Sequence, residues 1–426
     1  MNRVLTLVQP RQLEWRDEAL PKLEATQVRV KTLFSGISSG TELTQYRGTN
    51  PLLSKRFDLE TRLGVFGRIG TIALNVVHDA NIRLGARSAL DSVGRRGIRV
   101  EGNQHELHPP RGAHRLVKLM RAVMDAVAPG TVLVTETNVP HKDNIAYFGN
   151  VLKDGGTDEA QMVYQFPLPP LVLHTFRTAD STALLNWLRA LEPRDSGTAF
   201  FNFLASHDGI GVVPATGLVS SDDVMALAAQ VERHGGRVNE RDTPSGQRPY
   251  ELCTTLFDAL SDPNSAELEA VKIKRFLAAN AILLALQGVP GVYVHSLFGS
   301  PNDTAALDAS GINRRLNRHK FTHAELEAML FDPTSRASRV FAGMDAMLRA
   351  RRAHDAFSPS APQRLLETSS GIVAFERGDD GNVVRCFVNV STEPQPVSSL
   401  RGRDLITGLE VTQDTLEPYE VLWLED

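Results

Sequence analysis

The sequence predicts an α/β fold: the C-terminal half of a (β/α)8 TIM barrel, with a small all-β domain after it and a short β-rich segment before it. Three observations predict this arrangement. Helical and strand patterns alternate through the middle of the chain. Two apolar strands in that region run into acidic residues. Near residue 359 the pattern changes to short alternating strands.

We divide the chain into four segments: 1–66, 67–112, 113–358 and 359–426. The first is β-rich, because Gln27–Leu33 alternates polar and apolar residues and then enters a turn-forming stretch, Ser35–Gly40. The second is dense in arginine and glycine and keeps no stable periodicity. We therefore interpret it as an irregular junction. Its basic residues could suggest nucleic-acid binding, but it lacks the interleaved aromatic residues that are typical of such a stretch.

The third segment, 113–358, carries the barrel pattern. Apolar residues recur at helical spacing over His114–Ala128, and a short strand then runs from Val132 into Glu136. A second long helix is predicted over Glu267–Gln287, followed directly by a strand over Val289–His295. Helix, loop and strand therefore alternate as they do in the second half of such a barrel.

The last segment, 359–426, predicts the small β-domain. Two of its expected strands are Gly371–Phe375 and Val383–Val390. The strands are short and lie close together in the sequence, so we expect them to pair with one another.

Composition narrows the classes of function. A net charge of −4 gives no general affinity for nucleic acid or for an anionic membrane, and no run approaches 18 apolar residues. The only cysteines are Cys253 and Cys386, which argues against a disulfide framework. The first residues lack the pattern of a signal peptide. We expect a soluble, cytoplasmic protein without nucleic-acid or membrane partners.

Two acidic residues stand at the ends of predicted strands. Glu136 follows a β-branched strand, and Asp208 follows the apolar run Phe200–Ala205. Catalytic groups of a (β/α) barrel lie at the carboxyl ends of its strands, and paired carboxylates are the equipment for cleaving a glycosidic bond. The alternative is that both acids only cap helices or form surface ion pairs.

Four motifs extend this interpretation: TETNVPHKDNIAYFG, FLASHDGIG, QGVPGVYVHSLFGS and GINRRLNRHKF. In this order they resemble the α-amylase superfamily (glycoside hydrolase family 13), and within it the sucrose phosphorylase branch, which includes the glucosylglycerate phosphorylases. The resemblance covers about residues 107–426. It implies phosphorolysis of an α-glucoside by retaining double displacement, giving α-glucose 1-phosphate. The implied partners are a small carbohydrate and inorganic phosphate as co-substrate, with no metal or organic cofactor.

The same resemblance assigns roles to individual residues. Glu136 matches the general acid/base, a role that requires a raised pKa from burial or a nearby carboxylate. Asp208 matches the third carboxylate, which grips sugar hydroxyls, and His207 matches a histidine that contacts the sugar ring. The other residues expected to bind substrate are Arg314, Asn138 and His141. For Arg314, the alternative is a solvated arginine in an arginine-rich loop.

The expected nucleophile is Asp91. The family carries an aspartate on the strand before the general acid, within an Arg-Leu-Asp-Ala-like motif, and Gly85–Ser92 is the best match here. Ala89 stands where that motif has its arginine. Glu101 sits in a similar motif, but its spacing to Glu136 is too short.

The first segment resembles a different family. VRVKTLFSGISSGTELTQYRGTNP is similar to the N-terminal, GroES-like part of zinc-type medium-chain alcohol dehydrogenases. That family commonly has a zinc-binding cysteine here, but residues 35–41 contain no cysteine. The sequence also has no strand–GxGxxG–helix unit to bind a dinucleotide, so hydride transfer is not expected.

Two further alternatives stay open. One is a retaining α-glucosidase that uses water in place of phosphate. The other is a fused or frame-disrupted remnant without catalysis that at most binds sugars. A partial barrel would also leave open sheet edges, which favour a homo-oligomer.

We interpret residues 94–110 as translated out of frame. One choice of codons for Val100 to His108, read one nucleotide later, encodes Trp-Lys-Glu-Ile-Ser-Thr-Ser-Cys. The family typically has Trp-Lys-Glu-Ile-Gly-Thr-Ser-Cys at this place. We predict that the gene carries codons compatible with the shifted peptide; codons that forbid it would contradict this interpretation.

Overall fold

The structure is a computed structural model. It describes residues 2–9, 12–18 and 111–425, apart from 129, 153–154, 193–196, 244–245 and 380. The chain divides into two compact units, Met1–Arg99 with Ala122–Thr131, and Val100–Arg121 with Val132–Asp426. In the first unit, β1 (Asn2–Gln9) and β2 (Gln12–Glu18) form an antiparallel hairpin. The strand predicted at Gln27–Leu33 and the junction up to residue 110 lie outside the described residues.

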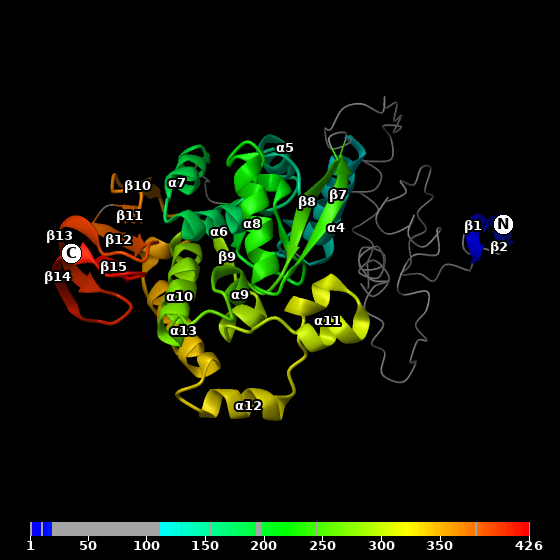
Figure 1. The fold of residues 1–426 in the computed structure, drawn as a ribbon. Helices are drawn as coiled ribbons and strands as arrows, with labels where there is room; N and C mark the ends of the chain where they lie inside the picture. Colours follow the sequence, from blue (N-terminus) through cyan, green and yellow to red (C-terminus); the bar gives the residue numbers. More distant parts are fainter. Residues whose placement is uncertain are drawn as a thin grey trace. The chain divides into compact units, whose positions relative to one another are not determined.

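The second unit contains a four-stranded sheet in which all strands are parallel and neighbours follow chain order. Its strands are β3 (Val134–Thr135), β4 (Met162–Tyr164), β5 (Ala199–Phe203) and β9 (Val289–Gly291). The register aligns Tyr164 with Phe201 and Phe203 with Gly291. Helices connect these strands, as parallel pairing requires, and the prediction of an α/β fold is confirmed (Figure 1).

Both long helices predicted from the sequence are present, as α4 and α10. The α-helices of the described residues are α4 (Arg111–Val127), α5 (His141–Ile145), α6 (Leu168–Thr178), α7 (Thr182–Arg189), α8 (Ser221–Arg233), α9 (Leu256–Leu260), α10 (Glu269–Ala285), α11 (Thr304–Ser310), α12 (His323–Phe331) and α13 (Arg336–Ala353). The short 3₁₀ helices are η2 (Ala146–Phe148), η3 (Val213–Ala215), η4 (Val294–Leu297), η5 (Asn313–Asn317) and η6 (Asp355–Phe357). No helix in the described ranges is long and apolar enough to cross a membrane.

A second, antiparallel sheet is inserted between β5 and β9. Its strand order is β6-β8-β7, from β6 (Ile210–Gly211), β7 (Arg237–Thr243) and β8 (Gly246–Cys253). Ile210 pairs with Leu252 and Gly211 with Glu251. This pairing brings β8 against the turn that follows β5.

The C-terminal part is a six-stranded antiparallel sheet in the order β10-β11-β12-β15-β13-β14. Its strands are β10 (Gln363–Leu365), β11 (Ile372–Asp379), β12 (Asn382–Asn389), β13 (Gln395–Asp404), β14 (Glu410–Leu416) and β15 (Val421–Glu425). The strands predicted at Gly371–Phe375 and Val383–Val390 correspond to β11 and β12.

The strand predicted over Val289–His295 is shorter in the structure. β9 ends at Gly291, and η4 begins at Val294. The amide of Ser296 donates to the carbonyl oxygen of Tyr293, and His295 Nδ1 lies 3.0 Å from Ser300 Oγ. These local bonds compete with strand pairing, because they curl the chain directly after the sheet.

The core is centred on α10, which packs beside α13 and against one face of the C-terminal sheet (Figure 1). Phe276 and Ile282 on this helix are buried, and so are Phe375 and Trp423 on the sheet. One continuous apolar cluster therefore runs from the helices α6 to α10 into the C-terminal sheet.

Two arginines cap the carboxyl end of α10. Arg377, from β11, is fully buried and donates to the carbonyl oxygens of Ala285 (2.6 Å), Ser358 (2.8 Å) and Ala361 (3.2 Å). Arg351, from α13, donates to the carbonyl oxygens of Leu284 and Gly288. Cations suit a helix C-terminus, because its last carbonyls carry partial negative charge.

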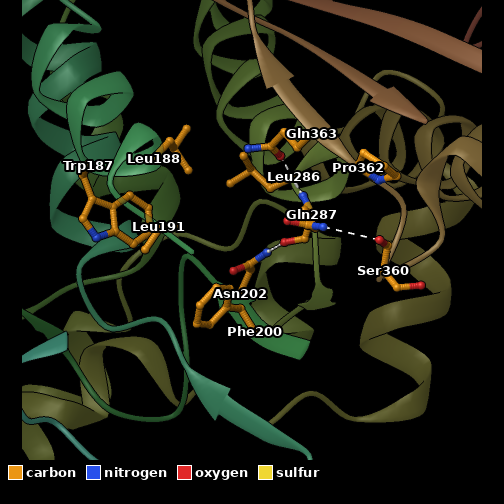
Figure 2. Close-up of a pocket in the computed structure, with 10 residues that line it drawn as sticks. All are labelled: Trp187, Leu188, Leu191, Phe200, Asn202, Leu286, Gln287, Ser360, Pro362 and Gln363. Carbon is orange, nitrogen blue, oxygen red and sulfur yellow. Dashed lines mark hydrogen bonds between the residues drawn. The ribbon is translucent and has the colours of Figure 1, made fainter. Parts of the chain in front are cut away.

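Figure 2 shows the junction beside this cap, where a cavity of about 270 Å³ lies between α7, the end of α10 and residues 360–363. Asn202 Nδ2 donates to the carbonyl oxygen of Gln287 (2.9 Å), and the Gln287 amide donates to Gln363 Oε1 (2.8 Å). The Gln287 side chain reaches the carbonyl oxygens of Ser360 and Ala361. These bonds link β5 to the start of the C-terminal sheet.

We predict that Arg377→Met lowers the free energy of unfolding by about 3 kcal/mol, because it leaves several buried carbonyl oxygens without donors. Urea denaturation measures this, with Arg349→Met as the control. Arg349 is exposed on α13 and pairs there with Asp345, so its loss is expected to change little. Equal effects of the two substitutions would contradict the role given to Arg377.

Candidate active site

A cavity of about 250 Å³ opens at the carboxyl ends of the parallel strands. Residues after β3, β4 and β5 line it, together with residues from β8 and η5. The polar residues lining it are Glu136, Asn138, Tyr164, Ser206, Asp208, Tyr250, Glu251 and Arg314. The apolar wall is formed by Phe166, Pro169 and Phe203, with Gly209 and Gly211. The cavity thus lies where parallel sheets of this kind place their ligands.

Glu136 is the first residue after β3. The next residue, Thr137, donates through Oγ1 to Asn144 Oδ1 (2.9 Å), and Asn144 Nδ2 donates to the carbonyl oxygen of Tyr164 (2.8 Å). Asn144 is buried on α5, so it fixes the loop that carries Glu136 to the neighbouring strand. The Glu136 carboxyl itself accepts no hydrogen bond from the described part of the chain and remains available to a ligand.

The pKa of Glu136 is raised, chiefly by partial desolvation against the cavity walls, although the side chain stays exposed to solvent. The Asp208 carboxylate raises it further, whereas the charges of His207 and Arg314 act in the opposite direction. A carboxyl with a raised pKa retains its proton to higher pH, which is the property a general acid needs.

Asp208 lies in the turn between β5 and β6. Asn317, from η5, holds this turn by donating Nδ2 to the carbonyl oxygens of Ser206 (3.0 Å) and Asp208 (2.8 Å). The Asp208 amide also donates to Ser206 Oγ (3.1 Å). The turn is therefore held both by Asn317, more than 100 residues further along the chain, and by the Ser206 side chain within the turn itself.

Two guanidinium groups bind the same oxygen of Asp208. Arg314 Nη1 lies 2.6 Å and Arg318 Nη2 lies 3.0 Å from Oδ1. His207 Nε2 is 3.7 Å from that oxygen. Oδ2 takes part in none of these contacts, so one oxygen holds the carboxylate in place while the other can accept hydrogen bonds from a ligand.

Glu136 comes together with His207 and Asp208, although Glu136 follows β3 and the other two residues follow β5. One ligating atom from each lies within 4.8 Å of the others. Such a set could in principle hold a cation. The two guanidinium groups already on Asp208 Oδ1 disfavour a metal ion by charge repulsion. The arrangement suits sugar hydroxyl groups better.

The other predicted site residues differ in their positions. Asn138 and Arg314 line the cavity. The ring of His141 lies beside Phe200, with ring centroids 6.0 Å apart, and His141 is not among the residues that line this cavity. Asp91, the predicted nucleophile, lies outside the described residues.

An aromatic wall was missed in the sequence analysis. Tyr164 stacks on Phe201 with centroids 4.7 Å apart, and Phe166 meets Phe203 edge to face at 5.4 Å. The signal was present, because alternate residues of adjacent strands point to the same side of a sheet. Burial, with the nearby Glu136 carboxylate, raises the pKa of the Tyr164 hydroxyl, which therefore stays protonated.

Glu251 was also missed. Its side chain is only 4% exposed, and Oε1 accepts from Arg314 Nη2 (2.8 Å) and from the Gly209 amide (2.9 Å). Asn239 Nδ2 donates to Oε2 (2.7 Å). The only sequence signal was an acidic residue beside the apolar end of a strand, which does not identify its partners.

We predict that Gly209→Ala destabilises the protein by about 1–3 kcal/mol, because a Cβ at this position would lie 2.6 Å from Glu251 Cγ and 2.7 Å from the Leu252 carbonyl oxygen. Gly211→Ala is the matched control, since its nearest neighbour would be Asn138 Nδ2 at 3.6 Å. Thermal unfolding compares the two. A Gly209→Ala variant as stable as Gly211→Ala would contradict the packing described here.

No family model matches the chain. It is 58% identical over 315 residues to the glucosylglycerate phosphorylase of Allomeiothermus silvanus, covering 74% of this chain and 55% of that protein. It is 42% identical over 318 residues to the glucosylglycerate phosphorylase of Escherichia coli K12, covering 73% and 56%. The chain therefore spans about half the length of these relatives.

A solved structure supports the fold. The chain resembles sucrose 6F-phosphate phosphorylase from Thermoanaerobacter thermosaccharolyticum with a TM-score of 0.56 at 20% identity, over 74% of this chain and 58% of that one. The sequence similarity supports the branch predicted from the motifs. Over the matched three quarters of its length the chain is similar to the glucosylglycerate phosphorylases, in agreement with the resemblance of its motifs to the sucrose phosphorylase branch of the α-amylase superfamily.

Proposed function

We propose that the parallel sheet is the C-terminal half of a (β/α)8 TIM barrel and that the protein is an α-glucoside phosphorylase. The observation that carries this proposal is the pairing of Glu136, whose pKa is raised, with Asp208, which two arginines hold. Both follow strands of one parallel sheet and face one cavity.

The reaction is a double displacement with retention at the anomeric carbon. A carboxylate, predicted to be Asp91, attacks that carbon while Glu136 gives its proton to the leaving glycosidic oxygen. The bond to the leaving group breaks, and a β-glucosyl-enzyme forms. Phosphate then attacks from the other face while Glu136 takes its proton. The first step thus releases the protonated leaving group (glycerate from glucosylglycerate), and the second gives α-glucose 1-phosphate and regenerates the enzyme's nucleophilic carboxylate, with no further cofactor.

Asp208 supports this chemistry by binding sugar hydroxyls. Its Oδ2 is available, while Oδ1 is fixed by Arg314 and Arg318. Hydrogen bonds of this kind strengthen as the ring gains oxocarbenium character in the transition state. His207 is exposed beside Asp208, where it can contact the same sugar. The aromatic wall of Tyr164 and Phe166 limits access of water, which would otherwise compete with phosphate.

Glucosylglycerate is the favoured substrate. Three relatives with 40–58% identity are glucosylglycerate phosphorylases, whereas the sucrose phosphorylase of Agrobacterium vitis is 29% identical. Sucrose is the second candidate. A retaining α-glucosidase would use the same groups with water as the acceptor.

A remnant without catalysis is the competing proposal. It is favoured by Ala89, which stands where the nucleophile motif has an arginine. In that case Glu136 and Asp208 would be inherited positions that at most bind sugars.

We predict that the protein releases glucose 1-phosphate from glucosylglycerate in phosphate buffer, faster than from sucrose. Glu136→Gln is expected to lower kcat/KM by about 10²–10⁴-fold, because it removes general acid/base catalysis. The control is Glu327→Gln on α12, where an exposed carboxylate contacts His323. Product release unaffected by Glu136→Gln would contradict the assigned role, and no release from folded protein would favour the remnant.

The pH dependence gives a separate prediction. Glu136 must be protonated to act as an acid, so kcat/KM should fall as the pH rises through its pKa. Because this pKa is raised, the fall is expected above the ordinary range of a glutamate. A profile of kcat/KM against pH measures this. A fall on the high-pH side (the basic limb of the profile) that is centred at the ordinary pKa of glutamate would contradict the prediction.

A further inference from the structure

Glu251 is a buried carboxylate that the proposed reaction does not use. It lies on β8, and its oxygens accept hydrogen bonds from Arg314, the backbone amide of Gly209 and Asn239. A carboxylate this deeply buried is costly unless its partners are fixed. Arg314 lines the cavity and Gly209 stands directly after Asp208, so the position of Glu251 is coupled to the geometry of Asp208.

Arg314 joins two carboxylates. Nη1 contacts Asp208 at 2.6 Å, and Nη2 contacts Glu251 at 2.8 Å. The guanidinium group is planar, so a bond to one nitrogen fixes the direction of the other. Glu251 in turn accepts a hydrogen bond from the backbone amide of Gly209, the residue directly after Asp208. The contacts from Asp208 to Arg314, from Arg314 to Glu251 and from Glu251 to Gly209 therefore form a closed ring, because Asp208 and Gly209 stand in the same turn.

We propose that Glu251 is a positioning residue for glycosyl transfer: it directs Arg314 onto Oδ1 of Asp208 and so leaves Oδ2 free for the sugar. This proposal rests on the function proposed above for Asp208. The pairing of Glu251 with Arg314 can nevertheless be measured whether or not the protein turns over.

The charge of Glu251 also matters for Glu136. Arg314 lowers the pKa of Glu136, and Glu251 offsets part of the Arg314 charge. Glu251→Gln keeps the shape of the side chain but removes this charge. Arg314 then acts more strongly on Glu136, so the basic limb of the pH profile moves to lower pH. A residue that served only packing would not move that limb.

The first test is a double-mutant cycle on unfolding in urea, with Glu251→Gln and Arg314→Met. We expect Glu251→Gln to lower the unfolding midpoint in the wild-type chain. In the Arg314→Met background it should be neutral or stabilising, because it removes a buried carboxylate that has lost its cation. Equal effects in both backgrounds would overturn the proposal. The control is Glu240→Gln, an exposed glutamate of the adjacent strand β7.

The second test measures phosphorolysis. Glu251→Gln is expected to lower kcat/KM by about ten- to a hundredfold, mainly through kcat, and to shift the basic limb to lower pH. Arg314→Lys should cause a similar loss, because one ammonium group cannot span both carboxylates. Retention of kcat/KM by either variant within about twofold would overturn the positioning role.

Failure of the two proposals can be told apart. If the wild-type chain releases no product, the proposed function fails. The unfolding cycle and the titration of Glu136, followed through its carboxyl ¹³C shift, then decide the inference. The positioning role would be supported, even for a protein that releases no product, by two results. The effects of Glu251→Gln and Arg314→Met on unfolding would be non-additive, and the pKa of Glu136 would be lower in the Glu251→Gln variant. Additive unfolding effects and an unchanged Glu136 titration would overturn it.

Discussion

The site depends on the bond between Asp208 Oδ1 and the guanidinium groups of Arg314 and Arg318. This contact joins the turn after β5 to η5, which follows β9, so it links segments on both sides of the inserted sheet. Charge-assisted hydrogen bonds of this kind are directional as well as strong. They leave one carboxylate oxygen constrained and the other available. The cavity keeps its shape because this link and the pairing of β6 with β8 act on the same turn.

Beneath the site, the rigidity comes from the end of α10. Arg377 and Arg351 approach this helix terminus from different elements and satisfy carbonyl oxygens that would otherwise be buried without donors. The residues that follow lead directly into β9. The C-terminal sheet therefore does more than cover an apolar face, since it fixes the start of a strand whose neighbour, β5, leads into the Asp208 turn.

The sequence predicted what depends on local pattern. The apolar periodicity of Glu267–Gln287 located α10 within two residues at each end, and the strand-end acids Glu136 and Asp208 face one cavity. Contacts between distant segments could not be read in this way. Nothing local indicates that Glu251 meets Arg314, because their encounter depends on how β8 pairs and where η5 passes. His295 was predicted in a strand, but local hydrogen bonds curl that stretch into a 3₁₀ turn.

Glu136 and Asp208 are proposed to act together in a retaining glycosyl-transfer site. The most direct measurement is the anomeric configuration of the sugar phosphate formed from glucosylglycerate, followed by ¹H and ³¹P NMR as the reaction proceeds. We expect α-glucose 1-phosphate as the first-formed product, because two inversions retain the configuration. A β-anomer formed first, or no sugar phosphate from a folded chain, would contradict it.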